Sequence, residues 1–336
     1  MEKIIDGKTV SMFTLKNSNG MSADITNFGA KVVRLFAADR DGKFDDVVLG
    51  FDTLDEVIEK EEYFGAVCGR FANRIKDGKF KIDGVEYNLA INNGTNALHG
   101  GVDAFNTKVW DVKEVTSSKL VLGLLSPDGE EGYPGNLNVT CTYELTDDNE
   151  LSIHYEATTD KPTVIGLTNH SYFNLKGAGN GTVRDHLLQI NADFVTILDD
   201  SFAPSGEIRP VDGTAFDFRK PVVIDERVDA EVYVPGRGID NNWCLRKEQQ
   251  GDCVLAGYIY APSCGRKMEV FGMQVYTANW VDKQVAKDGK TYEEQHSVCL
   301  ETQGFPNSPN VAHFPSSLLR PGQKYDEWCV YKFSVE

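Results

Sequence analysis

Alternation of apolar and polar side chains with a period of two dominates the sequence. Residues 137–145 read LNVTCTYEL, in which every second side chain, beginning with Leu137, is apolar or aromatic and those between are polar. Successive side chains of a strand point to opposite faces, so this pattern predicts a half-buried strand. Residues 150–158, ELSIHYEAT, alternate in the same way after a TDDN turn. We therefore predict an antiparallel hairpin with His154 on its outer face.

Three further segments have the pattern of hairpins. Residues 79–89 break at Asp83–Gly84, a pair that tolerates the positive φ angles of a tight hairpin turn. Residues 31–51 and 254–279 each hold two apolar, β-prone runs separated by turn residues. Strand followed by turn followed by strand is thus the recurring unit of this sequence.

Helical periodicity is scarce. The best candidate follows Thr53, where the letters T-L-D-E form a capping box and Leu54, Val57 and Ile58 form a short apolar stripe. Many short strands joined by turns predict an all-β fold, a large antiparallel β-sandwich with few short helices. We find no repeat or linker, and we expect one domain over residues 1–336.

Composition excludes several classes of partner. The 34 basic and 51 acidic residues give a net charge of -17, which disfavours nucleic acid and strongly anionic substrates. No apolar run approaches the roughly 18 residues of a membrane span, and the opening MEKIIDGKTV lacks the apolar stretch of a secretory leader. Seven scattered cysteines without a C-x-x-C pair favour reduced thiols over disulfides or zinc. We expect a cytoplasmic protein that does not contact membranes.

Polar groups suited to a neutral ligand concentrate in five short segments. They are GRFANRI (69–75), NALHGG (96–101), TNHSYFNL (168–175), GIDNNW (238–243) and LETQGFP (300–306). In this order and spacing they resemble the motifs of the aldose 1-epimerases, the galactose mutarotases, across nearly the whole chain. The resemblance implies a galactose mutarotase-like supersandwich with an open cleft, interconversion of the α and β anomers of free hexoses such as galactose and glucose, and no cofactor or metal.

The resemblance also implies a catalytic pair, with His170 as general acid and Glu301 as general base. Opening the hemiacetal requires one group that takes the anomeric hydroxyl proton and one that protonates the ring oxygen. A histidine titrates near neutral pH, and partial burial raises the pKa of a carboxyl group toward the same range. Taken alone, His170 also fits a hydrogen-bonded interior histidine, and Glu301 fits a solvent-facing residue one position beyond Leu300.

A second implied set contacts the sugar. Its members carry hydrogen-bonding side chains within the five segments or in the strand-like MQVYTAN, and they are Asn73, Arg74, His99, Tyr172, Asp240 and Gln274. Each has an ordinary structural alternative, and of Arg70 and Arg74 we expect one to be structural. Trp243 and Phe305 are aromatic candidates for a sugar face, although aromatic side chains more often pack in cores. Asn241 departs from the histidine that the family often has after the aspartate.

Other functions remain open at this point. A sugar-binding protein on the same scaffold would not need His170 and Glu301. A glycosidase would use two carboxylates, for which Asp240 and Glu301 are available. A mutarotase for pentoses or sugar phosphates is a variant of the main hypothesis, and the protein is expected to be a monomer or a homodimer.

Overall fold

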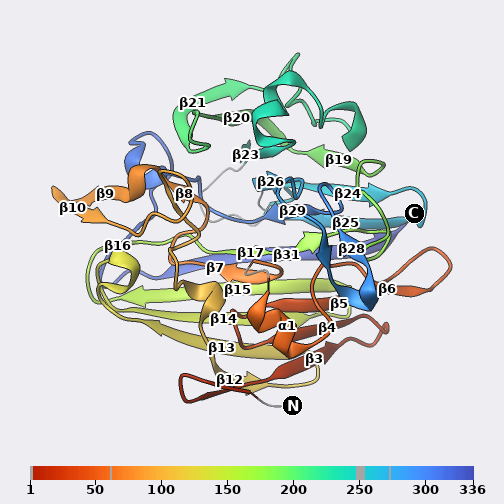
Figure 1. Cartoon of the computed structure of the whole chain (residues 1–336), viewed down its shortest axis with the longest axis horizontal. Coiled ribbons are helices and arrows are strands. Elements are labelled where there is room, and N and C mark those ends of the chain that lie inside the picture. The colour runs from red at the N-terminus through yellow and green to blue at the C-terminus, as the bar shows by residue number, and fades with distance from the viewer. Residues whose placement is uncertain (1–2, 61–62, 247–253, 272–273) are drawn as a thin grey trace.

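The computed structural model describes residues 3–60, 63–246, 254–271 and 274–336. Its largest sheet has nine antiparallel strands (Figure 1). In spatial order these are β12 (Asp111–Val115), β13 (Lys119–Ser126), β14 (Leu137–Leu145), β15 (Glu150–Thr159), β31 (Tyr325–Val335), β25 (Arg266–Val270), β24 (Gly257–Ala261), β19 (Leu187–Ile190) and β22 (Val222–Val223).

Two smaller sheets pack with it. The six-stranded sheet is β18 (Tyr172–Phe173), β29 (Val298–Glu301), β26 (Gln274–Tyr276), β23 (Asp240–Leu245), β20 (Ala192–Leu198) and β21 (Pro204–Pro210). The four-stranded sheet is β3 (Met12–Lys16), β4 (Ser22–Thr26), β5 (Val32–Ala38) and β6 (Phe44–Asp46).

Short strand pairs and turns complete the fold. The pairs are β1 (Lys3–Ile5) with β2 (Lys8–Val10), β7 (Ala66–Cys68) with β17 (Thr168–His170), β8 (Arg74–Ile75) with β11 (Ala97–Leu98), β9 (Lys79–Ile82) with β10 (Val85–Asn88), β16 (Thr163–Val164) with β30 (Leu318–Leu319), and β27 (Gln284–Val285) with β28 (Thr291–Tyr292). The 3-10 helices are Lys76–Gly78, Phe105–Thr107, Glu130–Gly132, Ile224–Glu226, Glu231–Gly236, Lys287–Gly289 and Ser308–Asn310.

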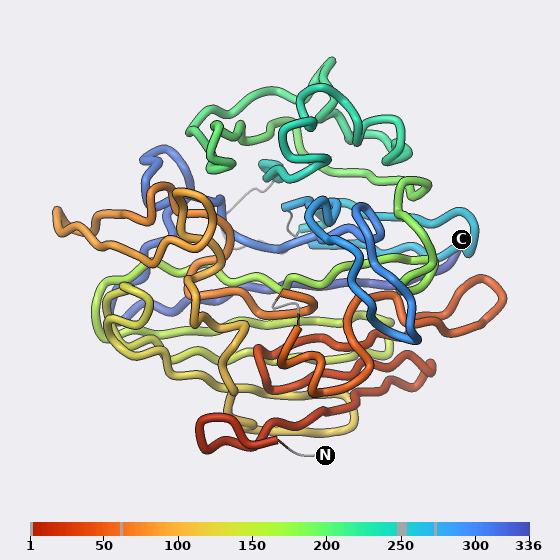
Figure 2. Tube along the Cα trace, viewed as in Figure 1, coloured from red at the N-terminus to blue at the C-terminus, as the bar shows by residue number. Residues whose placement is uncertain are grey.

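One hydrophobic core joins all three sheets. It contains Leu35 from β5, Ile153 from β15 and Leu300 from β29, each fully buried. In Figure 2 the N-terminal strands, in red, lie beside the yellow and green strands of residues 110–160, while residues 190–245 form the upper part of the molecule. The sandwich predicted from alternation is therefore confirmed, because sheets from distant parts of the chain bury their apolar faces against one another.

The hairpin predictions are confirmed in detail. β14 spans residues 137–145 and pairs with β15 in the expected antiparallel register. His154 lies on the face opposite the core and stacks on Trp328, with ring centres 3.9 Å apart. Asp83 and Gly84 both have positive φ, at 51° and 82°, in the turn between β9 and β10. β5 and β6 form the hairpin predicted within residues 31–51.

The segment 254–279 is divided between two sheets. β24 and β25 form the predicted hairpin in the nine-stranded sheet, but β26 pairs with β23 and β29 of the six-stranded sheet. The chain thus crosses between layers after β25. Residues 272–273 in this connection lie outside the described residues.

The predicted helix is α1 (Leu54–Glu59), and its N-terminal capping box is present. Thr53 Oγ1 accepts a hydrogen bond from the Glu56 amide, and the Glu56 carboxylate accepts one from the Thr53 amide. Within the described part of the chain, no helix has the length and hydropathy needed to cross a membrane. The six cysteines described all carry free thiols, while Cys253 lies outside the described residues.

Arg70 is a structural arginine. Its guanidinium group is buried and donates hydrogen bonds to the carbonyl oxygens of Ser126, Pro127, Pro134 and Gly135. Burial lowers its pKa to about 10, so that it stays charged at neutral pH. Through these bonds Arg70 holds residues 126–135 next to the segment that follows β7. Of the two arginines, Arg74 is therefore the one available to a ligand.

We predict that Arg70→Met lowers the free energy of unfolding by roughly 3 kcal/mol, because four buried carbonyl oxygens lose a charged donor. Guanidinium denaturation followed by circular dichroism measures this. The control is Arg246→Met, which removes an exposed arginine paired with Asp193 and should change stability by less than about 0.5 kcal/mol. Equal effects of the two substitutions would contradict the assignment.

Candidate active site

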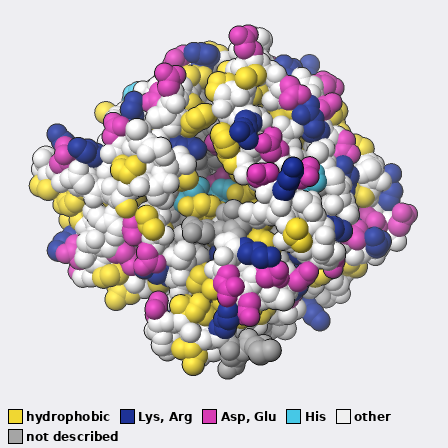
Figure 3. Space-filling view, in the orientation of Figure 1, with side chains coloured by type: hydrophobic (Ala, Val, Ile, Leu, Met, Phe, Trp, Pro, Cys, Tyr) yellow, Lys and Arg dark blue, Asp and Glu magenta, His cyan; other side chains and the backbone are white. Residues whose placement is uncertain are grey.

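A cleft of about 750 Å³ opens between loops of the six-stranded sheet and the small strand pairs. Figure 3 shows a hollow near the centre of one face, with histidine and acidic side chains visible inside it. The cleft is lined by Tyr63, Asn73, Arg74, Asn93, Gly94, Thr95, Leu98, His99, His170, Tyr172, Asp200, Ser201, Phe202, Asp240, Tyr276, Trp280, Val281 and Glu301. Seven of the eight predicted site residues line this cleft, and the eighth, Gln274, is buried and hydrogen-bonded to Asp240, which lines it.

The sequence Asn169-His170-Ser171 holds His170 where one strand pairing ends and another begins. β17 pairs with β7 up to His170, and β18 pairs with β29 from Tyr172 onward. The Asn169 side chain donates to the Gly65 carbonyl and accepts from the Ser171 hydroxyl, at 2.9 and 2.6 Å. These bonds fix the break between the strands, so the His170 ring is presented to the cleft at only 4% exposure.

Glu301 is the last residue of β29, and alternation along this strand turns it toward the cleft. Val298 and Leu300 pack in the main core, while Cys299 and Glu301 lie on the other face of the strand. That face is covered by further side chains and not by solvent, which leaves Glu301 only 2% exposed. Its Oε1 atom lies 3.5 Å from Nε2 of His170.

Burial drives both members of this pair toward their neutral forms. Loss of solvation raises the pKa of Glu301 well above its usual range, and the nearby charge of Asp240 raises it further. Burial lowers the pKa of His170 to about 4. Glu301 Oε2 and His170 Nδ1 are buried without a hydrogen-bond partner among the described residues. Burial therefore favours the uncharged form of both groups, a protonated carboxyl beside a neutral imidazole.

His99 is fixed as a neutral hydrogen-bond donor. Its Nδ1 atom accepts a bond from the Asn73 amide at 3.2 Å, while the His99 amide donates to the Asn73 carbonyl. The remaining ring proton is then on Nε2. Burial lowers the pKa of His99 well below its usual range, and the charges of His170 and Arg74 lower it further. Position 100 requires glycine. Its φ angle is 97°, and a Cβ atom there would lie 1.9 Å from the Gly69 carbonyl oxygen.

A chain of polar contacts orients Arg74 and Asp240. Arg74 donates from Nε to the Asn93 side chain and from Nη1 to Asp240 Oδ2, at 3.1 and 3.4 Å. Gln274 donates to Asp240 Oδ1 at 3.0 Å, and its own buried Oε1 has no described partner. Gln274 faces Glu301 across the β26–β29 pairing. Asn241 shares a face with Val275 of the main core, so the residue beside Asp240 points away from the cleft.

Aromatic rings surround His170. Tyr172 stacks on it at 4.9 Å between ring centres, as two residues of extended backbone predict, and Tyr276 and His99 meet it edge-on. The sequence did not single out Tyr63, Tyr276, Phe202 or Trp280. Tyr276 was detectable, because it follows Gln274 by two positions on the same strand. Neither of the two aromatic candidates lines the cleft, since Trp243 packs in the core and Phe305 packs against Phe314.

Comparison with known proteins agrees with this geometry. A family model described as aldose 1-epimerase matches residues 11–332. The chain is 44% identical to the galactose mutarotase of Sus scrofa over 97% of its own length and 95% of that protein's length. It is 42% identical to the human galactose mutarotase over 98% and 95%, and 32% identical to the aldose 1-epimerase of Escherichia coli over 98% and 97%.

The chain belongs to the aldose 1-epimerase family. A solved aldose epimerase homologue from C. elegans superimposes with a TM-score of 0.89 at 32% identity, covering 97% of this chain and 99% of that one. The galactose 1-epimerase structure from Lactobacillus acidophilus gives a TM-score of 0.85 at 26% identity, covering 99% and 97%. The predicted family and fold are both confirmed.

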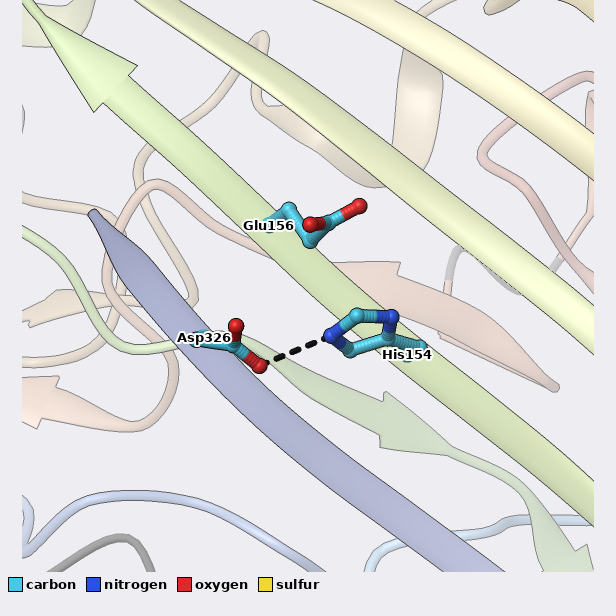
Figure 4. Close-up of side chains that lie close together, drawn as sticks. All are labelled: His154, Glu156 and Asp326. Atoms are coloured by element: carbon cyan, nitrogen blue, oxygen red, sulfur yellow. Dashed lines mark hydrogen bonds and ion pairs between the residues drawn. The ribbon is translucent and has the colours of Figure 1, made fainter.

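One cluster of potential metal ligands in this aldose 1-epimerase family member lies away from the cleft. His154, Glu156 and Asp326 project from neighbouring strands on the outer face of the nine-stranded sheet (Figure 4), and His154 Nε2 is 2.8 Å from Asp326. The ammonium group of Lys324 pairs with both carboxylates. A cation from the chain itself therefore already balances this cluster.

The contacts of His99 predict its tautomer. Long-range proton–nitrogen NMR correlations should show a neutral ring protonated at Nε2 at pH 6, because Nδ1 is occupied as an acceptor and burial lowers the pKa of His99 well below its usual range. The His99 signals are identified by their loss in His99→Asn. An imidazolium pattern at pH 6 would contradict this assignment.

Proposed function

We propose that this protein is an aldose 1-epimerase that interconverts the α and β anomers of free hexoses such as galactose and glucose, with His170 and Glu301 as its acid–base pair. The observation that carries the proposal is the 3.5 Å approach of these two side chains inside a cleft lined with polar side chains. Membership of the family supports the same reaction.

Ring opening and closure need only one proton donor and one acceptor. The Glu301 carboxylate takes the proton of the anomeric hydroxyl while the His170 imidazolium protonates the ring oxygen. The bond between C1 and the ring oxygen breaks, the C1 carbonyl forms, and rotation about C1–C2 exposes its other face. The two proton transfers then run in reverse, and the opposite anomer leaves.

This cycle interconverts the two states of the pair without changing its number of protons. The charged state, imidazolium with carboxylate, starts the ring opening, and the neutral state accompanies the open-chain sugar. Burial stabilises the neutral state. The charge of Arg74 acts in the other direction, because it lowers the pKa of Glu301. The two forms are thereby held closer in energy than burial alone would leave them.

The remaining residues are suited to an uncharged sugar. We assign hydroxyl contacts to Asn73, Arg74, His99 and Asp240, and packing against the His170 ring and the sugar to Tyr172. Gln274 acts on the sugar through its hydrogen bond to Asp240. Arg74 is already paired with Asp240, and Asp200 and Glu301 also line the cleft. A phosphate group would meet these acidic side chains, so unphosphorylated aldoses are the better substrates.

A glycosidase is the less suitable alternative. Asp240 and Glu301 would have to act as its two carboxylates, but Asp240 is held by Arg74 and Gln274 while the partner of Glu301 is a histidine. Such an enzyme would release nitrophenol from p-nitrophenyl galactosides. A non-catalytic sugar-binding protein would leave the buried His170–Glu301 pair without a role.

We predict that the protein accelerates the decay of optical rotation of freshly dissolved α-D-galactose and α-D-glucose, and that His170→Asn and Glu301→Gln each lower kcat by roughly 10²–10⁴-fold. Polarimetry measures this, with sugar binding and unfolding checked separately.

The matched controls are two residues on the outer face of the nine-stranded sheet. His154→Asn and Glu156→Gln make the same chemical changes away from the cleft and should leave the rate unchanged. No acceleration by the wild-type protein would refute the enzyme. Full activity of either cleft variant would refute the assigned pair.

The pKa directions also predict a pH profile. As pH falls through about 4, His170 gains a proton while Glu301 is already protonated, so no base remains and kcat/KM falls. At high pH the carboxyl loses its proton beside a neutral imidazole, and no acid remains. NMR exchange between anomer signals, corrected for solvent catalysis, gives the profile. An acid limb near pH 6.5 would show that His170 is not desolvated.

A further inference from the structure

The acid–base pair of the proposed reaction lies beyond the end of a strand pairing. Among the described residues, the ladder of β18 with β29 ends at the pair Tyr172–Cys299, and no register joins β17 to β29. His170 and Glu301 lie two residues beyond this end, one on each segment. A displacement of roughly 1 Å can cost a catalytic group about 10²-fold in rate. The 3.5 Å spacing of the pair therefore depends on contacts other than this ladder.

One buried hydroxyl group contacts the residue that precedes each member of the pair. Tyr331 Oη donates to the Leu300 carbonyl oxygen at 2.9 Å and lies 3.5 Å from the Asn169 carbonyl oxygen. A hydroxyl group carries one proton, so the bond to Leu300 is the main one and the Asn169 contact is its weaker branch. Glu301 follows Leu300 in the chain, and His170 follows Asn169. A single oxygen atom thus lies beside the backbone of both segments.

Tyr331 is anchored in the largest sheet of the protein. It lies within β31, where it pairs with Leu151 of β15 and with Val270 of β25. Its side chain is fully buried and packs against Phe173 of β18, with ring centres 4.8 Å apart. Burial raises the pKa of Tyr331 well above its usual range, so the hydroxyl group remains a donor at neutral pH. The two segments are therefore contacted from a fixed support.

The hydroxyl group of Tyr331 is behind the cleft and not in it. None of the described residues that line the cleft belongs to the nine-stranded sheet, and Tyr331 has no exposed surface with which to contact a sugar. A phenylalanine ring would fill nearly the same volume in the core. What the hydroxyl group adds is its contact with the two carbonyl oxygens.

We propose that Tyr331 is a positioning residue, whose hydroxyl group sets the spacing between His170 and Glu301 by holding the backbone that precedes each of them. This inference rests on the proposed function and adds to it a residue outside the cleft. Loss of the hydroxyl group leaves the sugar-contacting side chains in place but lets the two segments shift relative to each other. Such a shift lowers the rate of proton transfer more than it lowers the affinity for the sugar.

The test removes only the hydroxyl group. Tyr331→Phe should lower kcat for the mutarotation of galactose about tenfold and leave KM within about twofold of the wild-type value. NMR exchange between anomer signals gives both constants, at a temperature where circular dichroism shows the variant to be folded. A purely structural role of the hydroxyl group would lower the melting temperature but leave kcat of the folded protein unchanged.

A second measurement reports on the pair directly. The ring signals of His170 in proton–nitrogen NMR spectra, identified by their loss in His170→Asn, should shift in Tyr331→Phe. The reason is that the Glu301 carboxyl group beside the ring changes its distance from it.

Tyr233→Phe is the matched control. Tyr233 is also buried in the main core, and its hydroxyl group also donates to a backbone carbonyl, that of Ala215, at 3.2 Å. Neither residue lines the cleft. This substitution should change neither kcat, nor KM, nor the His170 signals.

Each other outcome overturns the inference. Unchanged kcat in folded Tyr331→Phe, a rise in KM without a loss of kcat, or a variant that does not fold would each refute the positioning role while the proposed function stands. An equal loss of kcat in Tyr233→Phe would show that any buried hydroxyl group of the core has this effect. If the wild-type protein equilibrates no sugar, the proposed function fails and the inference fails with it.

Discussion

Burial of a histidine and a glutamate side by side is the constraint around which this protein is arranged. Leaving water costs each charged form free energy, so burial raises the pKa of Glu301 and lowers that of His170. The burial requires that β29 be covered on both faces, by the main core and by the cleft side chains. It also requires that β17 and β18 deliver His170 at a break in the strand pairing. The sandwich supplies both conditions.

The chain contains a second histidine–carboxylate pair, and its properties differ. His154 and Asp326 are closer together, at 2.8 Å against 3.5 Å, but they lie on the outer face of the sheet. There the hydrogen bond to His154 lowers the pKa of Asp326, whereas burial raises that of Glu301. The pKa of the carboxyl group thus shifts in opposite directions in the two pairs. Solvation decides the direction of the shift, and distance does not.

Backbone conformations of low population gather around the cleft. Asn73, His99, Phe202 and Ala278 all have φ between 49° and 65°, although none is a glycine. Such conformations cost of order 1 kcal/mol each and persist where surrounding contacts enforce them. The reciprocal hydrogen bonds of Asn73 and His99 are one such set of contacts. The large shared core stabilises the fold enough to carry this strain beside the cleft.

Sequence alone determined the local strand structure and the residue types of the candidate site. Alternation located β14 and β15 and the side of the strand on which His154 lies, because side-chain direction in a strand follows from covalent geometry. The five motifs identified the family and named seven of the residues that line the cleft.

Tertiary structure decided everything that depends on how segments far apart in the chain pack together. Whether Glu301 faces solvent or a second buried layer, which of Arg70 and Arg74 is structural, and which aromatic rings face the cleft were all undetermined by sequence. The shift of the His170 and Glu301 pKa values was undetermined for the same reason. Solvation and contacts between sheets are properties of the packed molecule, and no local pattern of residues contains them.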